Sequence, residues 1–200
     1  MDNDSEALLH VDGLELTLGR KHLLAPASFT LHAGRCVALT GPNGSGKTTL
    51  LRIVTGKLQP TAGTFRWDGV KNTDLSLALG STPFYENMTV QEHLGLVAAS
   101  WSLEESAARP LVEGFGMEPI LDSFIEELSS GERQLVSLSL ALLRPAKVLI
   151  LDEPEQRLDT RRRQVLATLL NKQRELGAAV LMASHDTELV EAVADTVLQL

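Results

Sequence analysis

Two segments near the N-terminus alternate apolar with polar residues, whereas three later segments are continuously apolar. The alternation over 14–18 and 27–31 is typical of half-exposed antiparallel strands. The apolar runs at 36–39, 147–151 and 178–183 predict strands that are buried on both faces. We therefore expect one half-exposed antiparallel sheet and one sheet that is covered on both sides.

Helical segments and a further strand separate these runs. Residues 46–54 and 160–176 have helical patterns, and the apolar residues of the second segment form one face. Residues 62–68 are typical of a strand that ends at Gly69, and 197–200 again read as a strand. Because strands and helices alternate, we expect an α/β fold with a mostly parallel sheet and crossover helices.

The segment 90–130 differs from the rest of the chain. It is helical in character, lacks strand signals and is interrupted by glycines and a proline. Ser102 and Glu105 have the spacing of a capping box, which predicts a helix start there. We expect a single domain in which about 1–89 and 131–200 form the core and about 90–130 form an inserted helical subdomain.

Length and composition are those of a globular domain. The 200 residues are 44% hydrophobic and 22% charged, which excludes a disordered chain. The 26 acidic and 18 basic residues give a formal net charge of −8. This charge argues against nucleic acid as a partner, because phosphate contacts need a surplus of Lys and Arg. The one cysteine, Cys36, excludes an intramolecular disulfide.

Membrane and targeting signals are missing from the sequence. No apolar stretch is long enough to cross a bilayer. Residues 1–10 are acidic rather than basic, so they do not resemble a secretory signal. The sequence therefore predicts a cytoplasmic protein.

A glycine-rich loop follows the predicted strand at 36–39. It reads Gly41-Pro42-Asn43-Gly44-Ser45-Gly46-Lys47-Thr48 and fills every fixed position of the motif G-x-x-x-x-G-K-[ST]. Glycines let backbone N–H groups close around phosphate oxygens, and the following helix N-terminus adds positive charge. Lys47 can reach the β- and γ-phosphates, and Thr48 can bind Mg²⁺. The alternative, a chance glycine-rich turn, requires neither the strand before the loop nor the helix after it.

Two acids end the apolar run at 147–151. A strand that delivers carboxylates at its C-terminal end places them where open α/β sheets bind ligands. Asp152 is suited to hold Mg²⁺, and Glu153 is suited to polarise the water that attacks a γ-phosphate. The alternative is an ordinary surface pair of acids at a strand end.

Together with three further motifs, these features resemble the ATP-binding cassette (ABC) ATPases, the nucleotide-binding domains of ABC transporters. The family signature LSGGQ resembles Leu128-Ser129-Ser130-Gly131-Glu132-Arg133-Gln134. The family's D-loop resembles Glu155-Gln156-Arg157-Leu158-Asp159. Its histidine switch resembles Ser184-His185-Asp186. The resemblance covers nearly the whole chain. It implies the ABC ATPase fold, which is a P-loop NTPase core with a mostly parallel sheet, an antiparallel β-subdomain and an inserted helical subdomain. Taken alone, the signature segment also reads as a helix N-cap.

The resemblance implies that the chain binds ATP and Mg²⁺ and hydrolyses ATP. The catalytic roles would belong to Lys47, Glu153 and His185, and His185 would contact the γ-phosphate. Mg²⁺ would be held by Thr48 and Asp152. The residues implied to bind nucleotide are Gly41, Pro42, Asn43, Gly44, Ser45, Gly46, Lys47, Thr48, Thr49, Ser129, Gly131 and Asp159.

In this family the signature contacts ATP held by the opposite subunit, so the resemblance implies a sandwich dimer with a second ABC ATPase subunit. The main hypothesis is an ATPase subunit that drives a separate integral membrane permease from the inner face of the cell membrane. Export is favoured, because the compact cassette resembles exporter ATPases such as the haem-exporter type. Residues around Phe84, Tyr85 and Met88 either form a groove for the permease or fill the helical subdomain core. The alternatives are a non-transport ABC ATPase and a low-turnover regulatory subunit.

The sequence departs from the family pattern at several positions. Leu18 stands where the family usually stacks an aromatic residue on adenine, and Ser130 and Glu132 replace Gly and Gln of the signature. The family's glutamine between the two subdomains is missing, and Ser81 or Thr82 would partly fill its role through water. The remaining histidines belong to no recognisable motif, and we expect them to be surface residues: His10, His22, His32 and His93.

Overall fold

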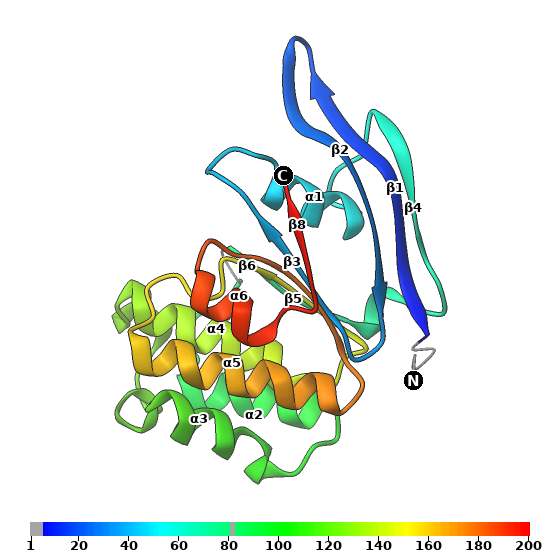
Figure 1. The fold of residues 1–200 in the computed structure, drawn as a ribbon. Coiled ribbons are helices and arrows are strands. Elements are labelled where there is room, and N and C mark those ends of the chain that lie inside the picture. The colour runs from blue at the N-terminus through cyan, green and yellow to red at the C-terminus, as the bar shows by residue number, and fades with distance from the viewer. Residues whose placement is uncertain (1–5, 81–82) are drawn as a thin grey trace.

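Two β-sheets organise the computed structural model, which describes residues 6–80 and 83–200 (Figure 1). The larger sheet is parallel, and its strands run in the order β5 (Leu75–Leu79), β6 (Val148–Asp152), β7 (Ala179–Ala183), β3 (Cys36–Thr40) and β8 (Thr196–Gln199). The smaller sheet is antiparallel, in the order β2 (Lys21–His32), β1 (Ala7–Leu18) and β4 (Ala62–Trp67). The expected α/β fold with one parallel and one antiparallel sheet is confirmed.

Both faces of the parallel sheet are covered, which explains its continuous apolar runs. In β3, Val37 and Leu39 belong to a buried cluster that the sheet shares with the antiparallel sheet and α1 (Lys47–Val54). Cys36 and Ala38 belong to a second cluster, which the sheet shares with the other helices. Because successive strand residues point to opposite faces, this one short strand contributes to both cores.

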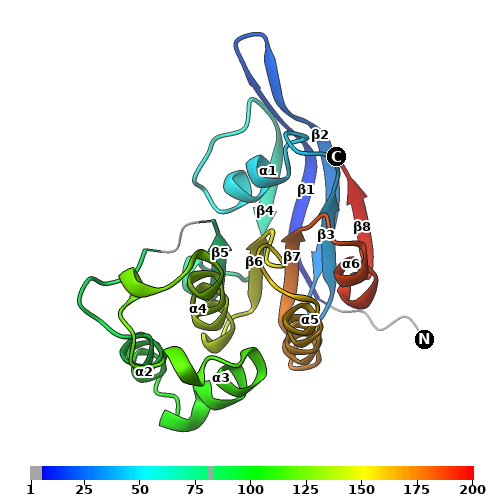
Figure 2. The same ribbon diagram turned by 90° about the vertical axis from the view of Figure 1, so that its left-hand side faces the viewer.

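Five helices lie on the face opposite α1 (Figure 2). They are α2 (Val90–Ser100), α3 (Arg109–Phe115), α4 (Ser130–Leu143), α5 (Thr160–Glu175) and α6 (Thr187–Val193). α4 and α5 lie next to the sheet, whereas α2 and α3 lie farther from it. Short 3-10 turns at 105–108, 118–120 and 125–127 lie between α2 and α4, and another at 72–74 lies between β4 and β5. Within the described ranges, no helix combines the length and the apolarity that a membrane crossing needs.

Some strands differ from the sequence expectation. β1 and β2 extend well beyond 14–18 and 27–31, because their ladder continues across several register shifts. β5 was not predicted, because the polar residue Ser76 interrupts its short apolar run. Ser76 is nevertheless buried, and its hydroxyl donates a hydrogen bond to the carbonyl of Ala141 (2.8 Å). The paired hydroxyl removes most of the penalty for burying it.

The predicted helix start at Ser102 is wrong, and the side chain of Glu105 lies outside the described residues. Ser102 has a φ of 53°, and the 3-10 turn that follows it has no side-chain cap. A capping box forms instead at the start of α2, where the hydroxyl of Thr89 accepts from the N–H of Glu92 (3.2 Å) and the carboxylate of Glu92 accepts from the N–H of Thr89 (2.7 Å). The spacing of a Ser or Thr three residues before a Glu does not by itself show whether a long helix follows.

Candidate functional site

The loops that follow β3, β6 and β7 begin at one edge of the parallel sheet. Leu39 and Asp152 both pair with Ala183, so the three strands end at the same level. Backbone hydrogen bonds continue past the strand ends: the N–H of Ser184 donates to the carbonyl of Leu39 (3.1 Å), and the N–H of Glu153 donates to that of Ala183 (2.8 Å). Residues far apart in sequence therefore meet at this edge, where open α/β sheets bind ligands.

Residues 41–46 form a tight loop between β3 and α1. Gly41 and Gly46 have φ values of 138° and 110°, in the left-handed region. A Cβ on Gly41 would lie 2.5 Å from the carbonyl oxygen of Leu200, and one on Gly46 would lie 2.7 Å from that of Leu23. Glycine is therefore required at both positions. The loop leads into the N-terminus of α1, whose free N–H groups and dipole favour an anion.

Lys47 lies buried at this loop. Its Nζ donates hydrogen bonds to the carbonyls of Gly41 (2.7 Å) and Pro42 (3.2 Å). Ser45 in the same loop has a buried hydroxyl oxygen for which the described residues offer no hydrogen-bond partner. The Lys47 cation, the unsatisfied hydroxyl of Ser45 and the free N–H groups are the kinds of donor that can hold a phosphate.

Asp152 and Thr48 meet below this loop. Burial raises the pKa of Asp152 above its ordinary value, and a hydrogen bond with the side chain of Thr48 opposes that shift. Oδ1 of Asp152 is buried and has no hydrogen-bond partner within the described residues. An orphaned carboxylate oxygen next to a hydroxyl is the kind of hard oxygen donor set that Mg²⁺ prefers. The residues at this position fit a magnesium ion.

Glu153 and His185 approach each other across the edge of the sheet. Glu153 has a φ of 48°, which bends the chain sharply at the end of β6. Oε1 of Glu153 lies 3.9 Å from Nδ1 of His185, and Oε2 accepts a hydrogen bond from the amide of Gln156 (2.7 Å). The structure thus brings together a carboxylate and an imidazole that stand 32 positions apart in the sequence.

The signature segment forms the N-terminus of α4. The hydroxyl of Ser129 accepts from the N–H of Glu132 (3.3 Å), and the carboxylate of Glu132 accepts from the N–H of Ser129 (2.8 Å). These hydrogen bonds with Ser129 lower the pKa of Glu132 below its ordinary value, so this side chain is an anion at neutral pH. Gly131 faces Arg157, and Asp159 caps α5 by accepting from the N–H of Arg162 (2.8 Å).

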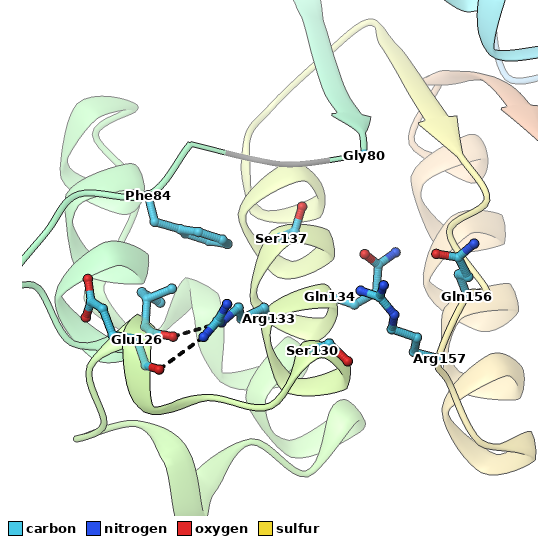
Figure 3. Close-up of a pocket in the computed structure, with 10 residues that line it drawn as sticks. Gly80, Phe84, Glu126, Ser130, Arg133, Gln134, Ser137, Gln156 and Arg157 are labelled. Carbon is cyan, nitrogen blue, oxygen red and sulfur yellow. Dashed lines mark hydrogen bonds between the residues drawn. The ribbon is translucent and has the colours of Figure 1, made fainter.

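A pocket connects the segment after β5 with the signature helix and the segment after β6 (Figure 3). Its volume is about 670 Å³, and Phe84 lies across it from Gln156 and Arg157. Arg133 on α4 donates to the carbonyls of Ile125 (3.1 Å) and Glu126 (3.0 Å), which fixes the turn before the signature. The pocket therefore touches three of the segments that the sequence singled out.

His93 is not a surface residue, which corrects the expectation from the sequence. It is only 3% exposed, its Nδ1 lies 2.8 Å from the carbonyl of Thr89, and its Nε2 accepts from the N–H of Tyr85 (3.0 Å). The rings of Phe84 and His93 meet edge to face with centroids 5.7 Å apart. A neutral imidazole that donates from Nδ1 thus anchors the segment that carries Phe84 and Tyr85.

Sequence reasoning missed two side chains near His185 and Glu153. Glu155 contacts the loop that carries His185, and Gln156 binds Glu153. Both lie in the segment that resembles the D-loop, but only their contacts in space distinguish them from solvent-facing residues. Leu18 is 71% exposed at the end of β1, while Ser81 and Thr82 lie outside the described residues.

Family models and curated relatives match this chain. The family model described as ABC transporter matches residues 24–156, and a model described as AAA domain, putative AbiEii toxin, Type IV TA system, matches residues 124–191. The chain is 36% identical over 199 residues to the zinc import ATP-binding protein ZnuC of Pseudomonas syringae pv. syringae (strain B728a), covering 96% of this chain and 73% of that one. It is 28% identical over 193 residues to the lantibiotic transport ATP-binding protein SrtF of Streptococcus pyogenes, covering 94% and 84%.

Solved structures show the same likeness. An ATP-binding subunit of an ABC transporter superimposes with a TM-score of 0.83 at 29% identity, covering 96% of this chain and 85% of that one. The RNase-L inhibitor superimposes with a TM-score of 0.86 at 27% identity, but this chain covers only 38% of its length. The likeness to a transporter subunit therefore extends over most of both chains.

The expectation of export is not borne out. The relatives at 34–37% identity carry names of zinc import proteins, and no exporter of the haem type stands among them. Compactness of the cassette was the basis for expecting export. Cassette length does not fix the direction of transport, because the cargo pathway belongs to another subunit.

Replacing Asp152 by Asn is expected to stabilise the ligand-free protein at neutral pH. Burial raises the pKa of Asp152, so folding favours its protonated form, and the wild type loses stability as pH rises through that pKa. The variant lacks this loss, and we expect a melting temperature higher by roughly 1–3 °C at pH 7, a modest effect because solvent screens the half-buried group.

Thermal unfolding at pH 4 and pH 7 measures this difference, which should shrink at the lower pH. Asp68→Asn is the matched control. A hydrogen bond from Arg66 lowers the pKa of Asp68, so removing this carboxylate should not raise the melting temperature. A lower melting temperature for Asp152→Asn at pH 7 would contradict the interpretation.

Proposed function

The chain belongs to the ABC transporter family, and from this membership we propose that it powers an importer as one half of a sandwich dimer. It is an ATP-binding protein and an ATPase, like the ATP-binding subunits of that family. The observation that carries the proposal is the convergence of the phosphate loop, Asp152, Glu153 and His185 at one edge of the parallel sheet.

The phosphate loop binds the triphosphate of ATP. The N–H groups of the loop, which Pro42 lacks, and that of Thr49 in the first turn of α1 donate to the phosphate oxygens. Lys47 leaves the carbonyls of Gly41 and Pro42 and reaches the β- and γ-phosphates. The buried hydroxyl of Ser45 gains a phosphate oxygen as its partner. Binding therefore replaces contacts within the loop by stronger contacts with an anion.

Thr48 and Asp152 hold Mg²⁺. The orphaned Oδ1 of Asp152 and the hydroxyl of Thr48 supply oxygen donors to the ion, directly or through water. When bound, the ion neutralises charge on the phosphate oxygens.

Glu153 accepts the proton of the attacking water. Its carboxylate is half-buried at the edge of the sheet and becomes available when Gln156 releases Oε2. His185 donates from its ring to an oxygen of the γ-phosphate and so stabilises the charge of the transition state. The two side chains act from neighbouring strand ends, which fixes their separation.

A second copy, or a related subunit, completes the site. Ser129 and Gly131 at the N-terminus of α4 meet the γ-phosphate of ATP bound to the partner subunit, and Asp159 lies at the same interface. To do so, Ser129 must leave its capping box with Glu132. The anionic Glu132 repels the phosphate, so closure is weaker here than with the neutral residue of the usual signature.

The permease docks beside the segment after β5. Tyr85 and Phe124 are 63% and 42% exposed although both are large and apolar, and Glu86 and Glu127 line a depression next to Phe124. We expect a permease helix with apolar and basic residues to bind there. Phe84, by contrast, packs on the helical core, so the segment serves both purposes considered from the sequence. Docking would hold the chain at the inner face of the membrane.

A low-turnover regulatory role is a second candidate. The missing glutamine between the subdomains and the hydrogen bond between Gln156 and Glu153 favour slow hydrolysis. A non-transport role is less favoured, because this chain covers only 38% of the ribosome recycling factor in the archaeal stalk complex. The rate of phosphate release, measured with and without permease, separates a transport ATPase from a slow regulator.

Glu153→Gln is expected to trap an ATP-bound dimer. The amide preserves the shape of the side chain but accepts no proton, so hydrolysis should fall by about 100-fold or more while ATP binding persists. Size-exclusion chromatography with ATP should show the dimer, and phosphate release should be nearly lost. Glu191→Gln, an exposed acid on α6, is the control. Wild-type turnover in Glu153→Gln contradicts the assigned role.

Leu18→Phe is expected to bind ATP about fivefold more tightly. An aromatic ring at this exposed position adds roughly 1 kcal/mol of stacking on adenine that an aliphatic side chain does not supply. Titration with ATP and with tripolyphosphate measures the effect, since tripolyphosphate has no base and should bind both proteins equally. An equal change for both ligands would exclude Leu18 from the base site.

Tyr85→Ser and Phe124→Ser are each expected to weaken binding to the permease by about tenfold, because each removes an exposed apolar contact. Co-purification with the membrane subunits measures this loss, and ATP binding should stay unchanged. Leu176→Ser removes an apolar side chain that is 75% exposed at the end of α5 and serves as the control. If Leu176→Ser impairs binding as strongly, the docking surface is misplaced.

A further inference from the structure

Glu155 is a buried carboxylate with no role in the mechanism above. It is 4% exposed and lies three residues after Asp152, under the loop that follows β7. Its Oε1 accepts hydrogen bonds from the hydroxyl of Ser184 (2.7 Å) and from the backbone N–H of His185 (3.0 Å). Removing a carboxylate from water is unfavourable, so its presence here calls for a specific partner.

The same oxygen also faces the ring of His185. Oε1 of Glu155 lies 3.5 Å from Nδ1 of His185, and Oε1 of Glu153 lies 3.9 Å from the same nitrogen. Two carboxylates thus approach Nδ1, while the ring is 57% exposed. The edge of the ring that carries Nδ1 therefore faces two carboxylates, and Nε2 remains for another partner.

The other charges near His185 do not explain this orientation. Asp186 on the same loop is paired with Arg163 of α5, with Nη1 and Oδ2 2.7 Å apart. Glu188 in the first turn of α6 lines the same pocket as His185. Glu155 is therefore the closest ionic partner of the His185 ring among the described residues.

We propose that Glu155 is a positioning residue that holds the ring of His185 with Nδ1 toward the carboxylates, so that Nε2 is left for the γ-phosphate. A phosphate oxygen only accepts hydrogen bonds, so Nε2 must carry a proton to bind it. The negative charge of Glu155 attracts the edge of the ring that carries Nδ1 and so keeps Nε2 on the side of the nucleotide. This inference rests on the proposed contact between His185 and the nucleotide.

Glu155→Gln separates charge from shape. The side-chain oxygen of Gln can still accept from Ser184 and from the N–H of His185, so the loop keeps its hydrogen bonds. The amide replaces Oε2, which has no partner within the described residues. Only the charge facing Nδ1 is lost. A role limited to loop packing would leave activity intact, whereas the proposed role would not.

The test is a double-mutant cycle on the full chain in complex with its permease. We compare kcat and KM of ATP hydrolysis for four proteins: wild type, Glu155→Gln, His185→Ala and the double variant. Single-turnover assays are used for the slow variants. We expect Glu155→Gln to lower kcat by about tenfold with KM changed less than twofold. In the His185→Ala background the same change should have no further effect.

A loss of equal size in both backgrounds, or an unchanged kcat, would overturn the proposal. Glu155→Asp and Ser184→Ala serve as second variants if Glu155→Gln does not fold. Glu155→Asp should lower kcat only when His185 is present, and Ser184→Ala, which keeps the charge, should stay within about twofold of wild type. If the wild-type complex does not hydrolyse ATP, the proposed function itself is refuted. If the wild type is active but the double-mutant cycle shows no coupling between Glu155 and His185, only the role of Glu155 is refuted.

Discussion

The parallel register of β3, β7 and β6 is the constraint on which the site depends. Because Ala183 pairs with both Leu39 and Asp152, the three strands end at one level. Each following loop therefore starts from the same edge and faces the same volume. A slip of one residue in any of these strands would turn its apolar residues to the wrong core and move its loop out of reach.

The backbone turns sharply at this edge, where β6 ends. Glu153 adopts a left-handed φ of 48° while its N–H still donates to Ala183, so the ladder holds a strained residue in place. The strain aims the carboxylate of Glu153 across the edge toward His185 rather than along the strand. Buried strands thus provide the rigidity that a site on loops would lack.

The sequence was sufficient to predict features that depend on residues close together in the chain. The phosphate loop lies between a buried strand and a helix because its glycines and the flanking apolar runs are consecutive, and the alternation of strands and helices gave the α/β fold. It was insufficient for Ser76, His93 and Glu155. Ser76 and Glu155 bind partners that stand 65 and 29 positions away in the sequence, and His93 binds the N–H of Tyr85 in the segment before α2. No helix or strand pattern encodes these contacts.

The phosphate loop and Ser129, which we propose to bind phosphate, belong to different parts of the fold. The phosphate loop belongs to α1 and the parallel sheet, whereas Ser129 belongs to α4, on the helical side (Figures 1 and 2). The pocket beside Phe84 touches the segment after β5, α4 and the segment after β6. A shift of α4 that brings Ser129 to nucleotide would change the shape of this pocket. The exposed Tyr85, which His93 anchors beside Phe84, would then pass that movement to a bound permease.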